Sequence, residues 1–172
     1  MYQEGAAVSN LNRVESDRTF EQAVLPERRR LYGLALIITR DPSAAEDAVQ
    51  ETLFSAWRSW SKVRDPHHPG GWLTRICVRE CLRRRQFDAP SRFADASVSA
   101  RAQGETAFGG ELLDFDRAFG LLTAKQRAVF TLHVRHGYTV AESASLMGCR
   151  PGTARSHLGR AVATLRKEMS HE

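Results

Sequence analysis

Apolar residues recur along the chain with the 3.6-residue period of an α-helix, while the two-residue alternation typical of β-strands is scarce. The first half therefore predicts helices over Phe20–Arg40, Pro42–Trp60 and Trp72–Arg85, with a kink or a helix start at Pro26. The helix over Pro42–Trp60 begins with a capping signal, because Asp41 precedes a proline in the first helical position. Its expected buried stripe is Ala45, Val49, Leu53, Ala56 and Trp60.

The apolar period is lost in two places. Residues 1–17 are polar, and we expect this tail to be disordered. Residues 87–110 are rich in Ala, Ser and Gly and have no strong apolar period, so they predict a linker. The pattern therefore predicts an all-α chain of two small helical domains, residues 18–86 and 111–170.

The second domain carries the pattern of a helix-turn-helix. Thr139 and Glu142 form an S/T-x-x-E capping box at the start of one helix, which Gly148 ends. A second helix follows over Pro151–Met169, and a tight turn with glycine joins the two. An earlier helix opens at Thr123, with four residues expected to face inward: Ala128, Val129, Leu132 and His133.

The chain has a formal net charge of +5 and a pI near 9.6, which indicates an anionic partner such as nucleic acid or a membrane surface. The polar N-terminus does not resemble a signal peptide, and no apolar run approaches the ~20 residues of a membrane span. Three cysteines without an export signal favour the reducing cytoplasm.

The last helix combines an apolar stripe with a polar face that suits the DNA major groove. Arginine pairs with guanine or phosphate, and small hydroxyl side chains reach phosphate or bases. A solvated basic face would explain the charge alone, but not the capping box and the turn. The expected DNA contacts are Thr153, Arg155, Ser156, His157 and Arg160.

The sequence argues against two other kinds of site. Cys77 and Cys81 lie one helical turn apart, with His67 and His68 upstream, but the spacing is not that of a zinc site. Buried thiols explain this pair better, so we expect no metal and no cofactor. Motifs of hydrolases and nucleotide-binding loops are missing from the sequence, which predicts a protein without catalytic activity.

Three stretches together resemble a known family. They are "AAEDAVQETLFSAWRSW" (44–60), "GGWLTRICVRECLRRR" (70–85) and "LLTAKQRAVFTLHVRHGYTVAESASLMGCRPGTARSHLGRAVATLRKE" (121–168). In this order they resemble the extracytoplasmic-function group of the sigma-70 family of RNA polymerase sigma factors, which keeps only regions 2 and 4. The W-x-x-W pattern followed by a Pro/Gly loop is most similar to the actinobacterial SigE-like branch.

The resemblance implies a promoter-specificity subunit of RNA polymerase. Region 2 would bind the clamp helices of the β′ subunit and melt the −10 element, and region 4 would lie on the β flap and read the −35 element. Many relatives are held by an anti-sigma factor, so such a partner is a further expectation.

The resemblance also implies roles for single residues. Asp47, Gln50 and Glu51 match the D-x-x-Q-E pattern that faces β′. Trp57 and Trp72 are expected in the core. The −10 contacts are expected among Trp60, Lys62, Arg64, His67, His68, Arg75, Arg79, Arg83 and Arg84.

The chain departs from the family pattern at several positions. Arg79 stands where asparagine is frequent, Arg83 where aspartate is frequent, and Arg150 where serine usually caps the recognition helix. His157 and Gly159 also stand where longer or more basic residues are frequent. These departures bear on promoter preference rather than on the family.

Two other functions fit part of the sequence. A stand-alone helix-turn-helix regulator would bind a palindrome as a dimer, whereas a free sigma factor is expected to be a monomer. A protein that only sequesters a polymerase subunit would leave Arg155 and Arg160 without a role.

Overall fold

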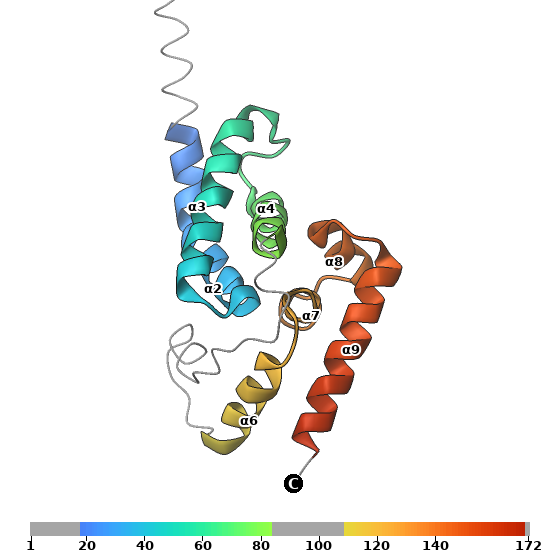
Figure 1. Cartoon of the computed structure of the whole chain (residues 1–172). Helices are drawn as coiled ribbons and strands as arrows, with labels where there is room; N and C mark the ends of the chain where they lie inside the picture. Colours follow the sequence, from blue (N-terminus) through green and yellow to red (C-terminus); the bar gives the residue numbers. More distant parts are fainter. Residues whose placement is uncertain (1–17, 84–108, 171–172) are drawn as a thin grey trace, which may run out of the picture.

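The computed structural model describes residues 18–83 and 109–170, and every regular element within them is helical (Figure 1). The prediction of an all-α fold is confirmed. The predicted tail over residues 1–17 and nearly all of the predicted linker lie outside the described residues.

Residues 18–83 form a first bundle of helices. A short helix over residues 18–24 leads through the 3-10 turn η1 (Leu25–Glu27), which contains Pro26, so the expected kink falls at the proline. The longer helices that follow are α2 (Arg28–Thr39), α3 (Pro42–Ser59) and α4 (Gly70–Arg83), with the 3-10 turn η2 (Trp60–Lys62) after α3.

The connection between α2 and α3 is set by two adjacent residues. Arg40 adopts the left-handed conformation with φ 55°, which ends α2. The carboxylate of Asp41 then accepts hydrogen bonds from the N–H groups of Ser43 (2.9 Å) and Ala44 (3.1 Å), as expected from the sequence. Because this connection is so short, α2 and α3 lie side by side and pack extensively against each other.

Residues 109–170 form a second bundle, in which α9 packs against three other helices. Its elements are α6 (Gly109–Gly120), α7 (Ala124–Phe130), the π-helical turn η4 (Thr131–Arg135), α8 (Val140–Met147) and α9 (Pro151–Met169).

The helix-turn-helix of α8 and α9 is confirmed. Thr139 and Glu142 make both hydrogen bonds of the capping box, and Gly148 ends α8 at φ 71°. Thr123 and Gln126 form a second capping box at the start of α7. The expectation that His133 faces inward is wrong: it is exposed, because the π-helical turn interrupts the α-helical register there.

The two bundles pack against each other. In Figure 1, α7 lies between α2 and α4 on one side and α9 on the other. Residues of α2 and α4 contact α7, and α4 also contacts α8. One continuous apolar cluster includes Leu31 and Leu73 of the first bundle together with Val129 and Met147 of the second. The described residues therefore share a core.

Candidate protein and nucleic-acid interfaces

An exposed acidic face lies on α3. The buried side of this helix carries small side chains such as Ala45 and Ala48. The opposite side exposes Asp47, Gln50 and Glu51, which lie next to one another because they are three and four residues apart. The three residues predicted to bind a basic partner are thus brought together.

Two exposed aromatic side chains continue this face. Phe54 is 54% exposed and Trp57 is 46% exposed, although Trp57 was expected in the core, an expectation that is wrong. The guanidinium of Arg58 lies 5.6 Å from the centre of the Phe54 ring. Large exposed aromatics beside carboxylates are typical of a protein-binding surface.

A groove adjoins the acidic face where α2 runs beside α3. It has a volume of about 390 Å³, and Leu25, Tyr32 and Val49 contribute apolar side chains. Arg28, Arg29, Glu46 and Gln50 complete its lining.

Residues 62–68, from the end of η2 into the loop before α4, carry the first predicted −10 residues. Lys62, Arg64, His67 and His68 are all exposed. Nδ1 of His68 lies 3.0 Å from a carboxylate oxygen of Asp65, and this hydrogen bond lowers the pKa of Asp65. The loop therefore presents its basic groups to solvent around one ionised carboxylate.

Trp60, also predicted for the −10 element, lies in the core. It is 7% exposed, and its ring packs edge-on against Phe20 with centroids 5.3 Å apart. Trp72 is partly buried, and its ring centroid lies 6.2 Å from that of Trp60. Because its ring is buried in this way, Trp60 packs in the core and is not available to stack on a DNA base.

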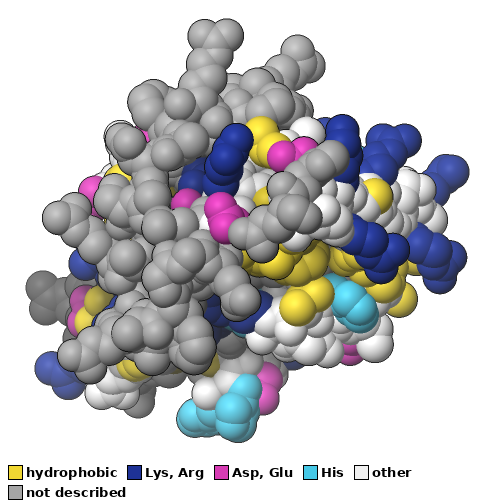
Figure 2. Space-filling view, turned by 90° about the horizontal axis from the view of Figure 1, so that it is seen from below, with side chains coloured by type: hydrophobic (Ala, Val, Ile, Leu, Met, Phe, Trp, Pro, Cys, Tyr) yellow, Lys and Arg dark blue, Asp and Glu magenta, His cyan; other side chains and the backbone are white. Residues whose placement is uncertain are grey.

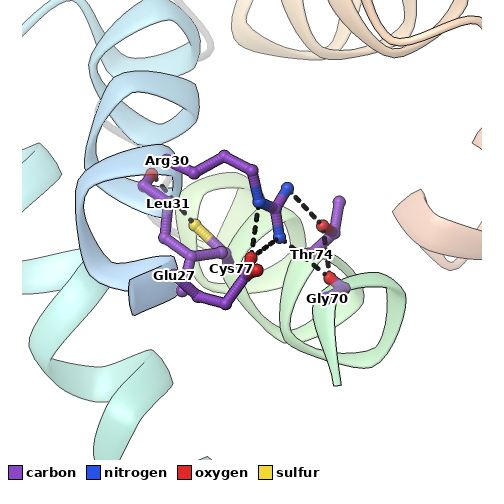
Figure 3. Close-up of polar contacts among 6 residues, drawn as sticks. All are labelled: Glu27, Arg30, Leu31, Gly70, Thr74 and Cys77. Atoms are coloured by element: carbon purple, nitrogen blue, oxygen red, sulfur yellow. Dashed lines mark hydrogen bonds and ion pairs between the residues drawn. The ribbon is translucent and has the colours of Figure 1, made fainter. Parts of the chain in front are cut away.

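Arg30 fastens the first turn of α4 to α2 (Figure 3). Its guanidinium donates to Glu27 (2.6 Å), to the hydroxyl of Thr74 (3.0 Å) and to the carbonyl of Gly70 (3.0 Å). One turn further on, the thiol of Cys77 lies 3.7 Å from the carbonyl of Leu31. These contacts set the position of α4, and hence of the arginines along it.

Arg75, Arg79 and Arg83 lie four residues apart on the exposed side of α4. Two of them reach the second bundle: Arg75 donates to the hydroxyl of Ser145 (3.0 Å) and Arg79 to its carbonyl (3.2 Å). Arg83 pairs with Glu80 at 2.8 Å within the helix. Arg84 lies outside the described residues.

The polar face of α9 is largely open. Thr153, Arg155, Ser156 and Arg160 are exposed, and His157 is half-buried. In Figure 2, Lys and Arg side chains project from the right of the molecule, the side on which α9 lies in Figure 1. The helix N-terminus, which enters the major groove in this motif, thus carries the basic residues.

The arginine face of α4 and the start of α9 line a common groove of about 440 Å³. Arg79 and Arg83 lie on one side, and Thr153 and His157 on the other. Two of the predicted −10 residues and two of the predicted −35 residues therefore line the same groove.

The polar contacts between the bundles have no signal in the sequence. Arg40 is 4% exposed and makes a two-pronged ion pair with Asp116 of α6, at 2.8 and 2.9 Å. Arg127 of α7 is 1% exposed and donates to the carbonyl of Ile38 (2.8 Å) and to that of Leu122. Burial, together with the charge of Arg40, lowers the pKa of Arg127 to about 10, so its guanidinium is still charged at neutral pH.

Within residues 18–83 and 109–170, no group of three or more His, Cys, Asp or Glu side chains is arranged to hold a metal ion. Cys77 and Cys81 are buried, whereas His67 and His68 are exposed in the loop. None of the described helices is both long and apolar enough to cross a membrane.

Comparison with known proteins identifies both bundles. Residues 24–88 match the family Sigma-70 region 2, and residues 112–165 match Sigma-70, region 4. The chain is 31% identical to the ECF RNA polymerase sigma factor SigM of Mycobacterium tuberculosis over 164 residues, covering 92% of this chain and 81% of that protein. It is 29% identical to the RNA polymerase sigma-E factor of Streptomyces coelicolor over 156 residues, covering 88% and 82%.

A solved structure agrees with the sequence relatives. The sigma factor RpoE, in complex with the anti-sigma factor NepR from Bartonella quintana, matches with a TM-score of 0.62 and 27% identity, over 89% of this chain and 98% of that one. The predicted resemblance is confirmed. The chain belongs to the extracytoplasmic-function group of the sigma-70 family of RNA polymerase sigma factors.

Proposed function

We propose that this sigma factor binds core RNA polymerase through the exposed face of α3 and directs it to promoters that it recognises with two separate sets of basic residues. One observation carries the proposal: a single chain combines an exposed acidic and aromatic helix face with a helix-turn-helix whose basic face is open to DNA. A DNA-binding module alone would not need the first surface.

The acidic face suits the clamp helices of the β′ subunit. Asp47 and Glu51 supply negative charge, Gln50 supplies an amide between them, and Phe54 and Trp57 add apolar area. Charge complementarity speeds association, and exposed aromatic side chains supply much of the affinity of protein interfaces. Phe54 and Trp57 thus extend the interface expected from sequence.

The promoter residues fall into two groups. Lys62, Arg64, His67 and His68 in the loop, with Arg75, Arg79 and Arg83 on α4, would hold the −10 strand after melting. Arg155 and Arg160, with Thr153, Ser156 and His157, would read the −35 element. The second bundle would meanwhile rest on the β flap.

This function implies a protein without catalytic chemistry of its own, acting in the cytoplasm with the transcription machinery. An anti-sigma factor is a further expected partner, as in the RpoE complex.

Transcription in vitro tests the proposal. The purified chain is added to sigma-free bacterial core polymerase and genomic DNA, and the RNA 5′ ends are sequenced. We expect discrete starts that need the chain and vanish in the double variant Asp47→Lys and Glu51→Lys. The matched control is Glu21→Lys, an exposed charge reversal on the helix over residues 18–24, which should leave the starts intact.

The same preparation tests the stand-alone regulator. Native mass spectrometry of the free chain should give a monomer. A dimer that binds duplex DNA, without any new transcription starts, would overturn the sigma-factor proposal in favour of the regulator.

A further inference from the structure

We infer that Gly159 is a specificity-determining residue of α9, because the lack of a side chain there lets the backbone of this helix approach the base edges of the −35 element. This inference rests on the proposed function, since it uses the role given above to α9 in reading that element. Gly159 itself is not among the DNA contacts expected from the sequence.

Gly159 lies on the outward side of α9, between two arginines. The helix runs along one side of the second bundle (Figure 1), and Gly159 is exposed. The residues on the buried side of α9 are Ala154, Ala161 and Leu165. At 3.6 residues per turn, Gly159 lies roughly 140° around the helix from the centre of that side, with Arg155 and Arg160 on either side of it. Gly159 therefore faces the DNA when both arginines do.

Nothing within the described part of the chain requires glycine at this position. Gly137 and Gly148 adopt positive φ, which favours glycine, but Gly159 does not. A Cβ atom added at Gly148 would lie 3.2 Å from Nε of Arg79, whereas one added at Gly159 would meet no atom within 4 Å beyond the neighbouring backbone of its helix. Glycine is also unfavourable in a helix interior, because it loses more conformational freedom on folding than any other residue. This glycine therefore destabilises α9 without serving a contact among the described residues, which points to a partner outside the chain.

The helix surface around Gly159 is low. One turn earlier, the hydroxyl of Ser156 donates a hydrogen bond to the carbonyl of Gly152 at 2.9 Å, so this short side chain lies against the helix. One turn later, Ala163 is exposed and adds only a methyl group. The backbone of α9 is therefore nearly bare at the part of its surface that would face the bases.

A helix in the major groove has little room to spare. The groove is about 12 Å wide, and an α-helix with its side chains measures about 10–12 Å across. A methyl group between the helix and the bases would hold the backbone back by about 1.5 Å, the length of one carbon–carbon bond. Hydrogen bonds to base edges need donor–acceptor distances of about 2.7–3.2 Å, so a displacement of this size would weaken the contacts of Arg155 and Arg160 together.

Thymine is the base that would use the space at Gly159. Its C5 methyl group projects into the major groove and is read by apolar contact, whereas guanine is read by arginine. The Cα atom of Gly159 offers apolar surface without a side chain in the way. We therefore expect a thymine–adenine pair opposite Gly159, next to the base pairs contacted by Arg155 and Arg160.

Transcription by the holoenzyme tests the role of Gly159. The templates are promoters whose starts are identified by 5′-end sequencing, each also made with its −35 element replaced by unrelated sequence. Gly159→Ala should lower transcription from the intact promoters about tenfold and should match wild type on templates without the element. The matched control is Gly33→Ala, inside α2, where an added Cβ would also meet nothing within 4 Å. It should leave transcription unchanged.

Uracil, which lacks the methyl group of thymine, tests the contact itself. Each thymine of the −35 element is replaced in turn by deoxyuridine, which leaves base pairing intact. At the position opposite Gly159, this replacement should restore transcription by Gly159→Ala severalfold and should not raise transcription by wild type. If no replacement restores transcription, Gly159 does not determine specificity and the inference is overturned.

Thermal unfolding separates an effect on specificity from an effect on the fold. Alanine is favoured over glycine in a helix, so Gly159→Ala and Gly33→Ala should each raise Tm by about 1–4 °C. Lower transcription with a raised Tm supports the inference. A lowered Tm would mean that Gly159→Ala damages the fold, and this result, or equal transcription by Gly159→Ala and wild type, would overturn the inference alone. A wild-type chain that starts no transcripts would contradict the proposed function, and the inference with it.

Discussion

Arg30 joins α2 to the first turn of α4 through two hydrogen bonds, to the hydroxyl of Thr74 and the carbonyl of Gly70. Arg30→Ala would leave the Gly70 carbonyl and the Thr74 hydroxyl without these donors. Hydrogen bonds to charged groups contribute roughly 1.5–3 kcal/mol, but the side chain is 36% exposed, so we expect a loss of about 1 kcal/mol of unfolding free energy. Urea unfolding of wild type and variant measures this loss of unfolding free energy. The exposed neighbour change Arg29→Ala should cost less than about 0.5 kcal/mol, and equal losses would contradict the role given to Arg30.

Arg155 and Arg166 project from opposite ends of α9 and should behave differently. Arg155→Ala removes a side chain placed to read a base edge, which is worth roughly 1–3 kcal/mol of discrimination, so transcription should become less sensitive to the −35 sequence. Arg166, exposed in the last turn of α9, would contact only the phosphate backbone, so Arg166→Ala should weaken all promoters alike. Transcription from templates with single −35 substitutions separates the two. Uniform weakening by Arg155→Ala would exclude a base contact.

The tryptophans show how far side-chain positions could be predicted. Trp60 falls on the apolar stripe of Ala45, Val49 and Ala56, and the structure buries it. Trp57 was expected in the core, yet it lies seven residues from Gln50, on the exposed face. The position of a tryptophan around the helix, rather than its hydrophobicity, decides whether its side chain is buried. No comparable signal marked His133, because its exposure follows from a π-helical turn that propensity does not predict.

The capping box of α8 supports the element that turns the chain into the recognition helix. Thr139→Ala removes the oxygen that accepts from the N–H of Glu142 and should lower the unfolding free energy by about 1 kcal/mol. Thr139→Ser keeps the oxygen and is the control. Urea unfolding that does not separate the two variants would mean that the cap contributes nothing to the fold.

The Glu142 side chain, the second partner in the capping box of α8, predicts that the stability of the fold depends on pH. Hydrogen bonds from the side chain and backbone N–H of Thr139 lower the pKa of Glu142 below its ordinary value of 4.5. The stabilisation is therefore complete above pH 4.5 and is lost as the pH falls through the lowered pKa. Glu142→Gln should be less stable than wild type at pH 6, and the difference should vanish at acid pH. A difference in unfolding free energy between Glu142→Gln and wild type that does not change with pH would contradict a role for the ionised Glu142 side chain.

Helix boundaries were predicted well where a capping signal exists. Asp41 and Thr139 marked two starts that the structure confirms. α4 begins at Gly70 rather than at the expected Trp72, because its first turn is held by Arg30, a residue distant in sequence. Contacts between residues that are distant in sequence leave no signal in the local sequence at the start of the helix.

The packing between the bundles was beyond prediction for the same reason. Arg40 and Asp116 are 76 residues apart, and in sequence each resembles an ordinary exposed charge. The family resemblance predicted two domains and their roles, but it did not imply that they share a core. The two helical domains were therefore predictable, whereas their packing against each other was not.

The apolar core that the two bundles share predicts how the whole chain unfolds. All three tryptophans, Trp57, Trp60 and Trp72, lie in the first bundle, so their fluorescence follows that bundle alone. Far-UV circular dichroism follows the helices of both. Because one apolar cluster joins the bundles, urea should unfold wild type in a single transition that coincides for the two signals.

Breaking the buried pair of Arg40 and Asp116 should uncouple these signals, with Asp114→Asn, an exposed change on the same helix, as the control. In Asp116→Asn we expect the circular dichroism transition to broaden and to separate from the fluorescence transition, because each bundle then unfolds with less support from the other. Asp114→Asn should keep the two coincident. Separate transitions in wild type itself would show that the interface is too weak to couple the unfolding of the two bundles.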